Sequence, residues 1–286
     1  MPDQAENLRQ FVQQKAGRAR VIAVSSGKGG VGKTNTCVNL GIALARNGAR
    51  VVLLDADLGL ANIEVLLGIN SLYNLQHVVT GQQSMMDVVV DAPGGIQVVP
   101  GSSGIAQIAD LGPNARENVL TGLEELQRHS DFILIDTMAG IGQNAVAFAI
   151  AADEVLLVTT PEPSSIVDAY ATIKTVFHQR PDAKFHVIVN QVMNKQQAAA
   201  VAHKLSDVTG RFLERNVSFA GFIPRDPRVM QAVMQTSPYI LRYPNAPASR
   251  AVATIAERLN RPDSSARAGR GFLQRVAETF GIAKTA

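Results

Sequence analysis

Residues 25–36 of the chain have the sequence SSGKGGVGKTNT, which contains four glycines and two lysines. The segment GKGGVGKT (27–34) satisfies the pattern G-x-x-x-x-G-K-[ST] of a phosphate-binding loop. In such a loop the backbone N–H groups and the start of the following helix bind phosphate oxygens. Lys33 is expected at the β- and γ-phosphates, and Thr34 at Mg²⁺. Lys28 has no role in this pattern and needs a separate explanation.

The segments on both sides of the loop indicate a strand before it and a helix after it. RVIAVSS (20–26) is a short apolar run, and NTCVNLGIALARNG (35–48) has apolar residues at helical spacing. Further apolar runs, most of them separated by helix-like stretches, occur at 49–57, 95–100, 131–137, 153–160, 184–191 and 217–224. Such runs are typical of strands buried on both faces. The sequence therefore predicts an α/β fold, with a mostly parallel twisted sheet and helices on both faces.

Composition narrows the class of protein. A chain of 286 residues with 46% hydrophobic side chains can form a soluble protein with one large domain. The net charge is only +3, too small by itself to indicate binding to nucleic acid or membrane. A single cysteine, Cys37, excludes an intramolecular disulfide and a metal site built from the cysteines of one chain. The sequence contains no secretory signal and no membrane-spanning run, so we expect a cytoplasmic protein.

The two ends of the chain differ from the expected core. The predicted parts are an N-terminal tail (1–19), the nucleotide-binding domain (20–260), a linker (261–270) and a C-terminal amphipathic helix (271–286). Phe272, Leu273, Val276 and Phe280 fall on one side of this last helix, beside arginines. The pattern is typical of a helix that lies in a membrane interface, weakly as one copy and more strongly as two. The alternative is a terminal helix packed permanently on the protein.

Acidic residues follow two of the predicted strands. VVLLDADLG places Asp55 and Asp57 after one strand, and FILIDTMAG places Asp136 after another. Phosphoryl transfer requires carboxylates at such positions, to hold the metal ion and to orient the attacking water. The alternative is that these aspartates only cap loops, where aspartate is common. The nearby phosphate-binding loop favours the catalytic interpretation.

The loop and the acidic residues together resemble the deviant Walker A ATPases of the MinD/ParA type. Their pattern K-G-G-x-G-K-[ST] matches KGGVGKT (28–34), and the resemblance covers roughly residues 20–260. It implies ATP and Mg²⁺ as cofactors and a face-to-face homodimer in which Lys28 reaches the partner's phosphates. It also implies that Asp57 orients the water, and that Asp55 and Asp136 act on Mg²⁺ through coordinated waters. The implied nucleotide contacts are Gly29, Gly30, Val31, Gly32, Lys33, Thr34 and Asn35, with Asn190, Pro224 and Asp226 on the adenine side and Glu162 across the dimer.

Two further stretches resemble one group within that family, the flagellar-number ATPases called FlhG, FleN or YlxH. DQAENLR (3–9) is similar to a segment that, in this group, docks on the GTPase FlhF and stimulates GTP hydrolysis, with Gln4 at the position of the active glutamine. DADLGLANIEVLLG (55–68) is similar to the group's switch region. The resemblance implies a peripheral ATPase on the inner face of the cell membrane that controls flagellar number or placement. Flagellar switch proteins or a flagellar transcription regulator are further candidate partners.

Other functions remain open from the sequence. A DNA-partition ATPase of the ParA type would bind nonspecific duplex in a salt-sensitive way, and direct DNA binding is not what we expect here. A division-site ATPase of the MinD type would share the lipid-binding helix. A metabolic phosphotransferase with the same loop would need neither Lys28 nor the C-terminal helix.

Overall fold

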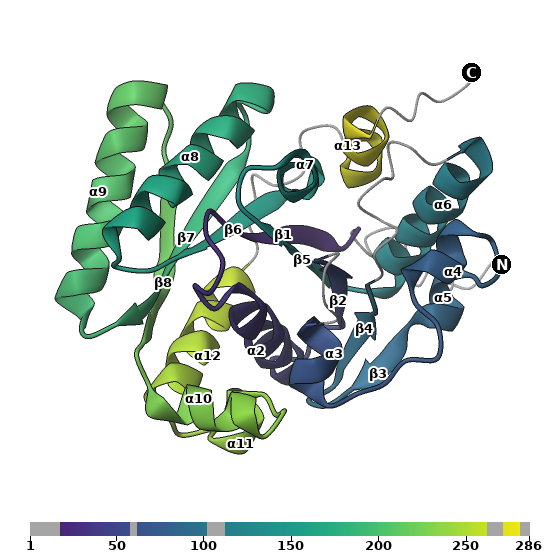
Figure 1. Cartoon of the computed structure of the whole chain (residues 1–286), viewed down its shortest axis with the longest axis horizontal. Coiled ribbons are helices and arrows are strands. Elements are labelled where there is room, and N and C mark those ends of the chain that lie inside the picture. The colour runs from purple at the N-terminus through teal and green to yellow at the C-terminus, as the bar shows by residue number, and fades with distance from the viewer. Residues whose placement is uncertain (1–17, 58–61, 102–111, 262–270, 281–286) are drawn as a thin grey trace, which may run out of the picture.

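The computed structural model of the chain describes residues 18–57, 62–101, 112–261 and 271–280. Within these residues, eight strands form one sheet in the order β3-β4-β2-β5-β1-β6-β7-β8 (Figure 1). The strands are β1 (Arg20–Ser26), β2 (Val51–Ala56), β3 (Val90–Ala92), β4 (Ile96–Val99), β5 (Phe132–Ala139), β6 (Glu154–Thr159), β7 (Lys184–Val192) and β8 (Ser218–Pro224). Only the β3–β4 pair among them is antiparallel. The parallel strands therefore all end at one edge of the sheet, called here the carboxyl edge.

Helices cover both faces of the sheet (Figure 1). One layer contains α2 (Lys33–Arg46), α3 (Asn62–Leu67), α10 (Pro227–Met234), α11 (Tyr239–Arg242) and α12 (Pro247–Leu259). The other contains α4 (Leu75–Val79), α5 (Met85–Val88), α6 (Pro113–His129), α7 (Gln143–Ala151), α8 (Pro163–Gln179), α9 (Lys195–Leu213) and α13 (Phe272–Thr279). The arrangement confirms the predicted α/β class.

The apolar runs of the strands are buried because each face of the sheet meets a helical layer. On β1, Val21 and Ala23 belong to the core under α6–α9, while Ile22 and Val24 belong to the core under α2 and α12. All four side chains are fully buried. The expected strands are therefore confirmed with shifts of a few residues at their ends. Strand β3 was not predicted, and α2 begins at Lys33, the last lysine of the phosphate-binding loop, as expected.

Helix α13 packs on the body of the protein. Phe272, Val276 and Phe280 are buried against α7 and α6, and the rings of Phe280 and Phe148 lie 5.4 Å apart. The Arg275 guanidinium donates to the Ala151 carbonyl at 2.8 Å, at the end of α7. The predicted helix is present, but in this conformation its apolar face is covered by protein. Among the described residues, no helix is long and apolar enough to cross a membrane.

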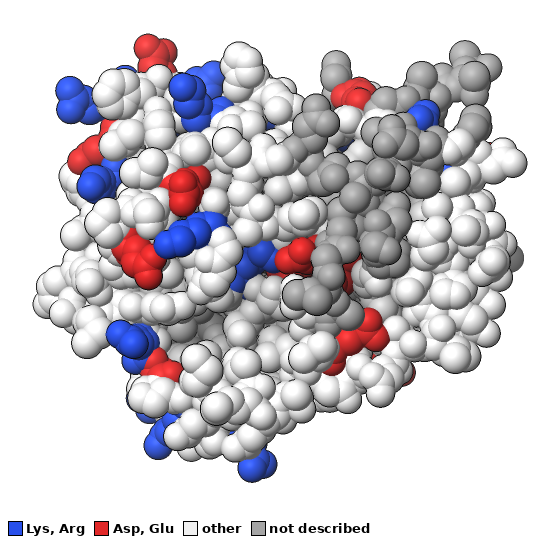
Figure 2. Space-filling view, in the orientation of Figure 1, with Lys and Arg blue, Asp and Glu red and all other residues white. Residues whose placement is uncertain are grey.

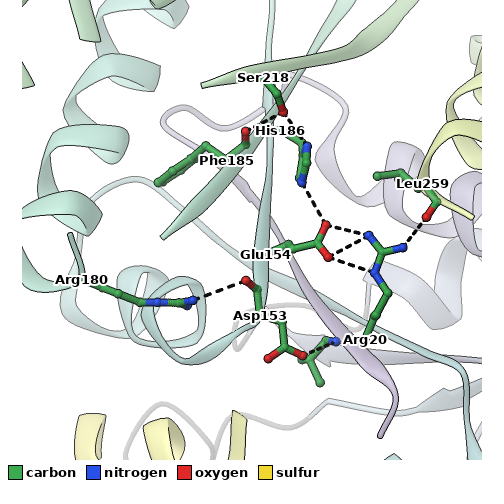
Figure 3. A network of polar contacts seen from close by, with 9 residues as sticks. Arg20, Asp153, Glu154, Arg180, Phe185, His186, Ser218 and Leu259 are labelled. Carbon is green, nitrogen blue, oxygen red and sulfur yellow. Dashed lines mark hydrogen bonds and ion pairs between the residues drawn. The ribbon is translucent and has the colours of Figure 1, made fainter. Parts of the chain in front are cut away.

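A charged network lies at the opposite edge of the sheet, where the strands begin (Figure 3). The Glu154 carboxylate accepts hydrogen bonds from the Arg20 guanidinium at 2.8–2.9 Å and pairs with His186 Nε2 at 2.9 Å. Arg20 also donates to the Leu259 carbonyl at the end of α12. His186 Nδ1 lies 2.6 Å from the Ser218 hydroxyl. The network thus joins β1, β6, β7, β8 and α12 far from the phosphate-binding loop.

Candidate active site

The phosphate-binding loop lies at the carboxyl edge, between β1 and α2. The Ser26 hydroxyl donates to the Lys28 carbonyl at 3.1 Å, and the Asn190 amide donates to the Val31 carbonyl at 2.8 Å. Because a trans peptide is planar, its N–H points away from its carbonyl oxygen. The amides of Gly29 and Gly32 therefore point away from these contacts. Side chains that hold the loop carbonyls outward leave the N–H groups on the inner side, where a phosphate would lie.

Two glycines in this loop cannot carry a side chain. Gly32 has φ +87°, and a Cβ there would lie 2.4 Å from the Asn190 amide nitrogen. A Cβ on Gly27 would lie 2.2 Å from the backbone carbonyl carbon of Asp168 in α8. The loop therefore packs directly on β7 and α8, and the glycines of the motif permit this close approach.

Lys33 lies at the base of the loop between two of the predicted aspartates. Its ammonium is 2.7 Å from Asp136 Oδ1 and 3.8 Å from Asp57 Oδ2, and the lysine is 7% exposed. The nearby Thr34 hydroxyl acts with Lys33 to oppose the rise in the pKa of Asp136. The other oxygen, Asp136 Oδ2, is buried and has no hydrogen-bond partner among the described residues. A buried polar atom without a partner is costly, which indicates that a ligand completes this site.

Asp55 and Asp136 face each other as register partners on β2 and β5. Burial, and then the nearby Asp136 carboxylate, raise the pKa of Asp55 to about 7. Burial also raises the pKa of Asp136, although Lys33 opposes this effect. Two carboxylates in a low-dielectric site repel each other, and a divalent cation would relieve that repulsion. The oxygen-rich set of Asp55, Asp136 and the Thr34 hydroxyl fits Mg²⁺, which prefers such ligands.

Asp57 lies at the mouth of the site and is less buried. Its side chain is 24% exposed, and its backbone N–H donates to Asp55 Oδ1 at 3.0 Å. The Ile63 N–H donates to the other Asp55 oxygen at 3.4 Å, so Asp55 connects the start of α3 to this site. A carboxylate that is partly solvated and next to the phosphate-binding loop can accept a hydrogen bond from an attacking water.

The residues predicted on the adenine side have structural contacts of their own. Asn190 is 9% exposed, and its amide supports the loop as described above. Pro224 ends β8, and Asp226 caps α10, accepting from the N–H groups of Arg228 at 3.0 Å and Ala248 at 3.3 Å. These contacts place all three residues at the carboxyl edge. Binding to a base remains a prediction.

Lys28 lies on the rim of the site and not beside Lys33. Its ammonium is 2.9 Å from Glu162 Oε2 and 3.2 Å from the Ser164 hydroxyl, both at the start of α8. The hydrogen bond that the Lys28 ammonium donates to Glu162 raises the pKa of Lys28. Charged side chains of both signs lie close together near the centre of this face (Figure 2). The contact between Lys28 and Glu162 within one chain was not predicted.

Two other predicted residues need a separate statement. Asn35 lies in the first turn of α2, where its backbone carbonyl accepts from the Asn39 amide at 2.8 Å. Its side-chain oxygen is buried without a partner among the described residues. Gln4 lies outside the described residues.

A loop that offers backbone N–H groups, with a buried lysine, a threonine hydroxyl and paired aspartates at its base, defines a P-loop NTPase whose residues fit nucleotide phosphates and Mg²⁺. A model of the ParA family, described as NUBPL iron-transfer P-loop NTPase, matches residues 17–260. The chain belongs to this ParA/MinD family of ATPases.

Relatives of known name and structure agree with this assignment. The chain is 41% identical to antiactivator FleN of Pseudomonas aeruginosa over 241 residues, covering 84% of this chain and 86% of that protein. It is 34% identical to flagellum site-determining protein YlxH of Helicobacter pylori, covering 71% and 68% respectively. The structure of septum site-determining protein MinD from Pyrococcus horikoshii, complexed with Mg-ADP, matches with a TM-score of 0.70 and 26% identity, covering 85% and 96%.

The chemistry of ATP hydrolysis assigns separate tasks to these residues. Loop amides and the Lys33 ammonium would bind the phosphates. They would also stabilise the negative charge that develops on the leaving oxygen in the transition state. Thr34, Asp55 and Asp136 would hold Mg²⁺, which neutralises phosphate charge when bound. Asp57 would orient the attacking water. The burial of Lys33 and Asp136 strengthens these charge interactions, because water screens them weakly.

Proposed function

We propose that the chain is an ATPase that dimerises on Mg-ATP and regulates the number or placement of flagella. The position of Lys28 carries the first part of this proposal. Its ammonium lies on the rim, 42% exposed, outside the group of Lys33 and Asp136 that serves the chain's own nucleotide. A cation in this place suits a phosphate presented by a second subunit, where it would act as an arginine finger does.

The surface around the site supports pairing of two subunits. Several large apolar side chains are exposed in segments that follow different parallel strands, and all of these segments begin at the carboxyl edge. They are Ile141 (55% exposed), Val167 (65%), Met193 (71%) and Met230 (64%). Exposed apolar groups on segments that begin at one edge of a sheet fit an interaction surface at that edge. A face-to-face dimer would bury them and bring each Lys28 toward the other nucleotide.

Sedimentation tests the dimer directly. Wild type is expected to be monomeric with ADP and dimeric with ATP. Lys28→Ala should dimerise with ATP only at much higher protein concentration, whereas Lys174→Ala, which changes an exposed lysine on α8, should behave as wild type. Asp57→Ala should bind ATP, hydrolyse it slowly and accumulate as a dimer. A monomeric Asp57→Ala protein with ATP would overturn this mechanism.

The flagellar part of the proposal is supported by the name of the relative from Helicobacter pylori and by the resemblance of residues 3–9 and 55–68 described above. Restoring the gene to a deletion strain should restore the flagellar number, and the Asp57→Ala allele should not. A peptide of residues 1–12 is expected to accelerate GTP hydrolysis by FlhF, and Gln4→Ala should abolish the effect. An unchanged flagellar number in the deletion strain would reject this role.

Membrane association through α13 is also proposed, in the ATP-bound state. Since Phe272, Val276 and Phe280 are buried against the body here, the helix has to leave α7 before it inserts. Liposome flotation should show binding with ATP and little with ADP. Val276→Asp should abolish this binding, and Gln274→Ala, at an exposed position of the same helix, should not. Binding to duplex DNA in place of lipid would favour a partition ATPase.

A further inference from the structure

Lys28, Glu162 and Ser164 form a contact within one subunit, called here the Lys28 latch. The ammonium lies between the Glu162 carboxylate at 2.9 Å and the Ser164 hydroxyl at 3.2 Å. Lys28 belongs to the phosphate-binding loop, and the other two residues belong to the start of α8. The latch therefore closes one side of the loop mouth with residues 134 and 136 positions away in sequence.

The backbone on both sides of the latch is held in place. The Lys28 carbonyl accepts from Ser26, and Gly27 packs on the backbone of Asp168 without room for a methyl group. At the start of α8, the Ser165 hydroxyl accepts from the Thr160 N–H at 3.1 Å and lies 2.9 Å from the Thr159 hydroxyl. These contacts hold the loop against the start of α8. The side chains of the latch can therefore change partners without a change in the backbone around them.

The side chains themselves are open to solvent. Lys28 is 42% exposed and Glu162 is 63% exposed. An ion pair this exposed is weak and exchanges readily. A lysine has a flexible four-carbon stem, so its ammonium can reach a new partner without movement of the backbone. In the latch, the Lys28 ammonium is nevertheless bound to Glu162 of its own subunit. This hydrogen bond has to break before the ammonium can bind a phosphate of a second subunit.

We propose that Glu162 restrains dimerisation by holding Lys28 on its own subunit until the partner's nucleotide competes for it. This inference rests on the proposed ATP-dependent dimer and gives Glu162 a role in the free subunit. It differs from a contact between Glu162 and the partner's nucleotide, which would stabilise the dimer. The two roles predict changes of opposite sign when the carboxylate is removed.

The test is the dimer dissociation constant in saturating Mg-ATP, measured by sedimentation for wild type and Glu162→Gln. Two latches open for each dimer, so a restraint of about two- to threefold per latch gives a total of about four- to tenfold. Glu162→Gln should therefore dimerise about four- to tenfold more tightly. Glu257→Gln, which removes an exposed carboxylate from α12, should match wild type. Lys28→Ala is measured as a fourth protein. All four are compared in the same buffer, because salt screens exposed charges.

A double variant assigns the effect to the contact itself. If Glu162 acts through Lys28, adding Glu162→Gln to Lys28→Ala should produce no further change. An unchanged or weakened dimer for Glu162→Gln, with a normal ATP-dependent dimer for wild type, would overturn the latch and leave the proposed function standing. If Glu162→Gln tightens the dimer of Lys28→Ala as much as it tightens the wild-type dimer, the latch would also be overturned. Failure of wild type to dimerise with ATP would reject the proposed function, and the latch with it.

Discussion

Replacement of Glu154 by glutamine should lower the stability of the folded chain without touching the nucleotide site. Glu154 is 2% exposed and is bound by Arg20 and by His186 at the edge where the strands begin (Figure 3). Removing one partner from a buried ion pair costs about 3–5 kcal/mol. Arg20 and His186 are 23% and 27% exposed, so water reaches them when the carboxylate is lost. We therefore expect a smaller loss of unfolding free energy, about 2–3 kcal/mol, at or just below the low end of that range.

The loss should depend on pH in a defined direction. Burial alone would raise the pKa of Glu154, but the contacts from His186 and Arg20 outweigh it and hold that pKa below its usual value of 4.5. A carboxylate with a lowered pKa in the folded state stabilises the fold above its unfolded pKa, and the contribution disappears as pH falls through the folded pKa. The difference between wild type and Glu154→Gln should be full at pH 7 and should shrink below about pH 4.

Urea unfolding of the nucleotide-free protein at several pH values measures this difference. Glu124→Gln is the matched control, since Glu124 pairs with Arg128 on α6 while both side chains remain exposed at 46% and 65%. Glu124→Gln should lower the free energy of unfolding by less than about 0.5 kcal/mol. A loss of unfolding free energy for Glu154→Gln that is no larger than the loss for Glu124→Gln at pH 7 would show that the buried ion pair does not stabilise the fold. A difference that stays constant as the pH falls would refute the pH dependence.

Three other predictions concern different parts of the chain. The pKa of Asp55 is raised to about 7 in the folded protein, so between about pH 4 and 7 the folded state binds a proton that the unfolded state has lost. The free energy of unfolding of the metal-free protein should therefore fall as pH rises through this range. Asp55→Asn should flatten this dependence in urea unfolding with EDTA, and an unchanged slope would contradict the prediction. Gly27→Ala should lower the melting temperature because a Cβ meets the Asp168 backbone, whereas Gly210→Ala, in open space on α9, should not; equal values would contradict this. Val276→Asp should remove hydrogen-exchange protection from α13 and leave the strands protected; persistent protection of α13 would contradict the docking.

The fold was predictable because most strands are buried on both faces and therefore appear as apolar runs. Strand β3 was not, because it has three residues, pairs with β4 at the edge of the sheet and is only partly buried. The docking of α13 could not be derived from its pattern. The same apolar face, with Phe272 and Val276, suits lipid and the surface of α7 equally well.

The site was predictable where one motif or one strand end contains the signal. Lys33, Asp55 and Asp136 were found in this way, but their distances depend on the pairing of β2 with β5. The contact between Lys28 and Glu162 joins segments with no local relationship in sequence. The capping role of Asp226 was not predicted, although the sequence contains a signal for it. Asp followed by Pro, here Asp226 and Pro227, is typical of the start of a helix.

The order of the strands in the sheet affects how the chain folds during synthesis. Strand β1 carries the phosphate-binding loop and is the first to leave the ribosome, but its neighbours are β5 and β6. Arg20 pairs with Phe132, and Ile22 lies beside Glu154, each more than a hundred residues later. Such distant pairing is slow, because a long loop closes before the contact forms. The apolar residues of β1 therefore stay without a sheet partner until almost half of the chain has been made, and a nascent chain is most prone to aggregation during that interval.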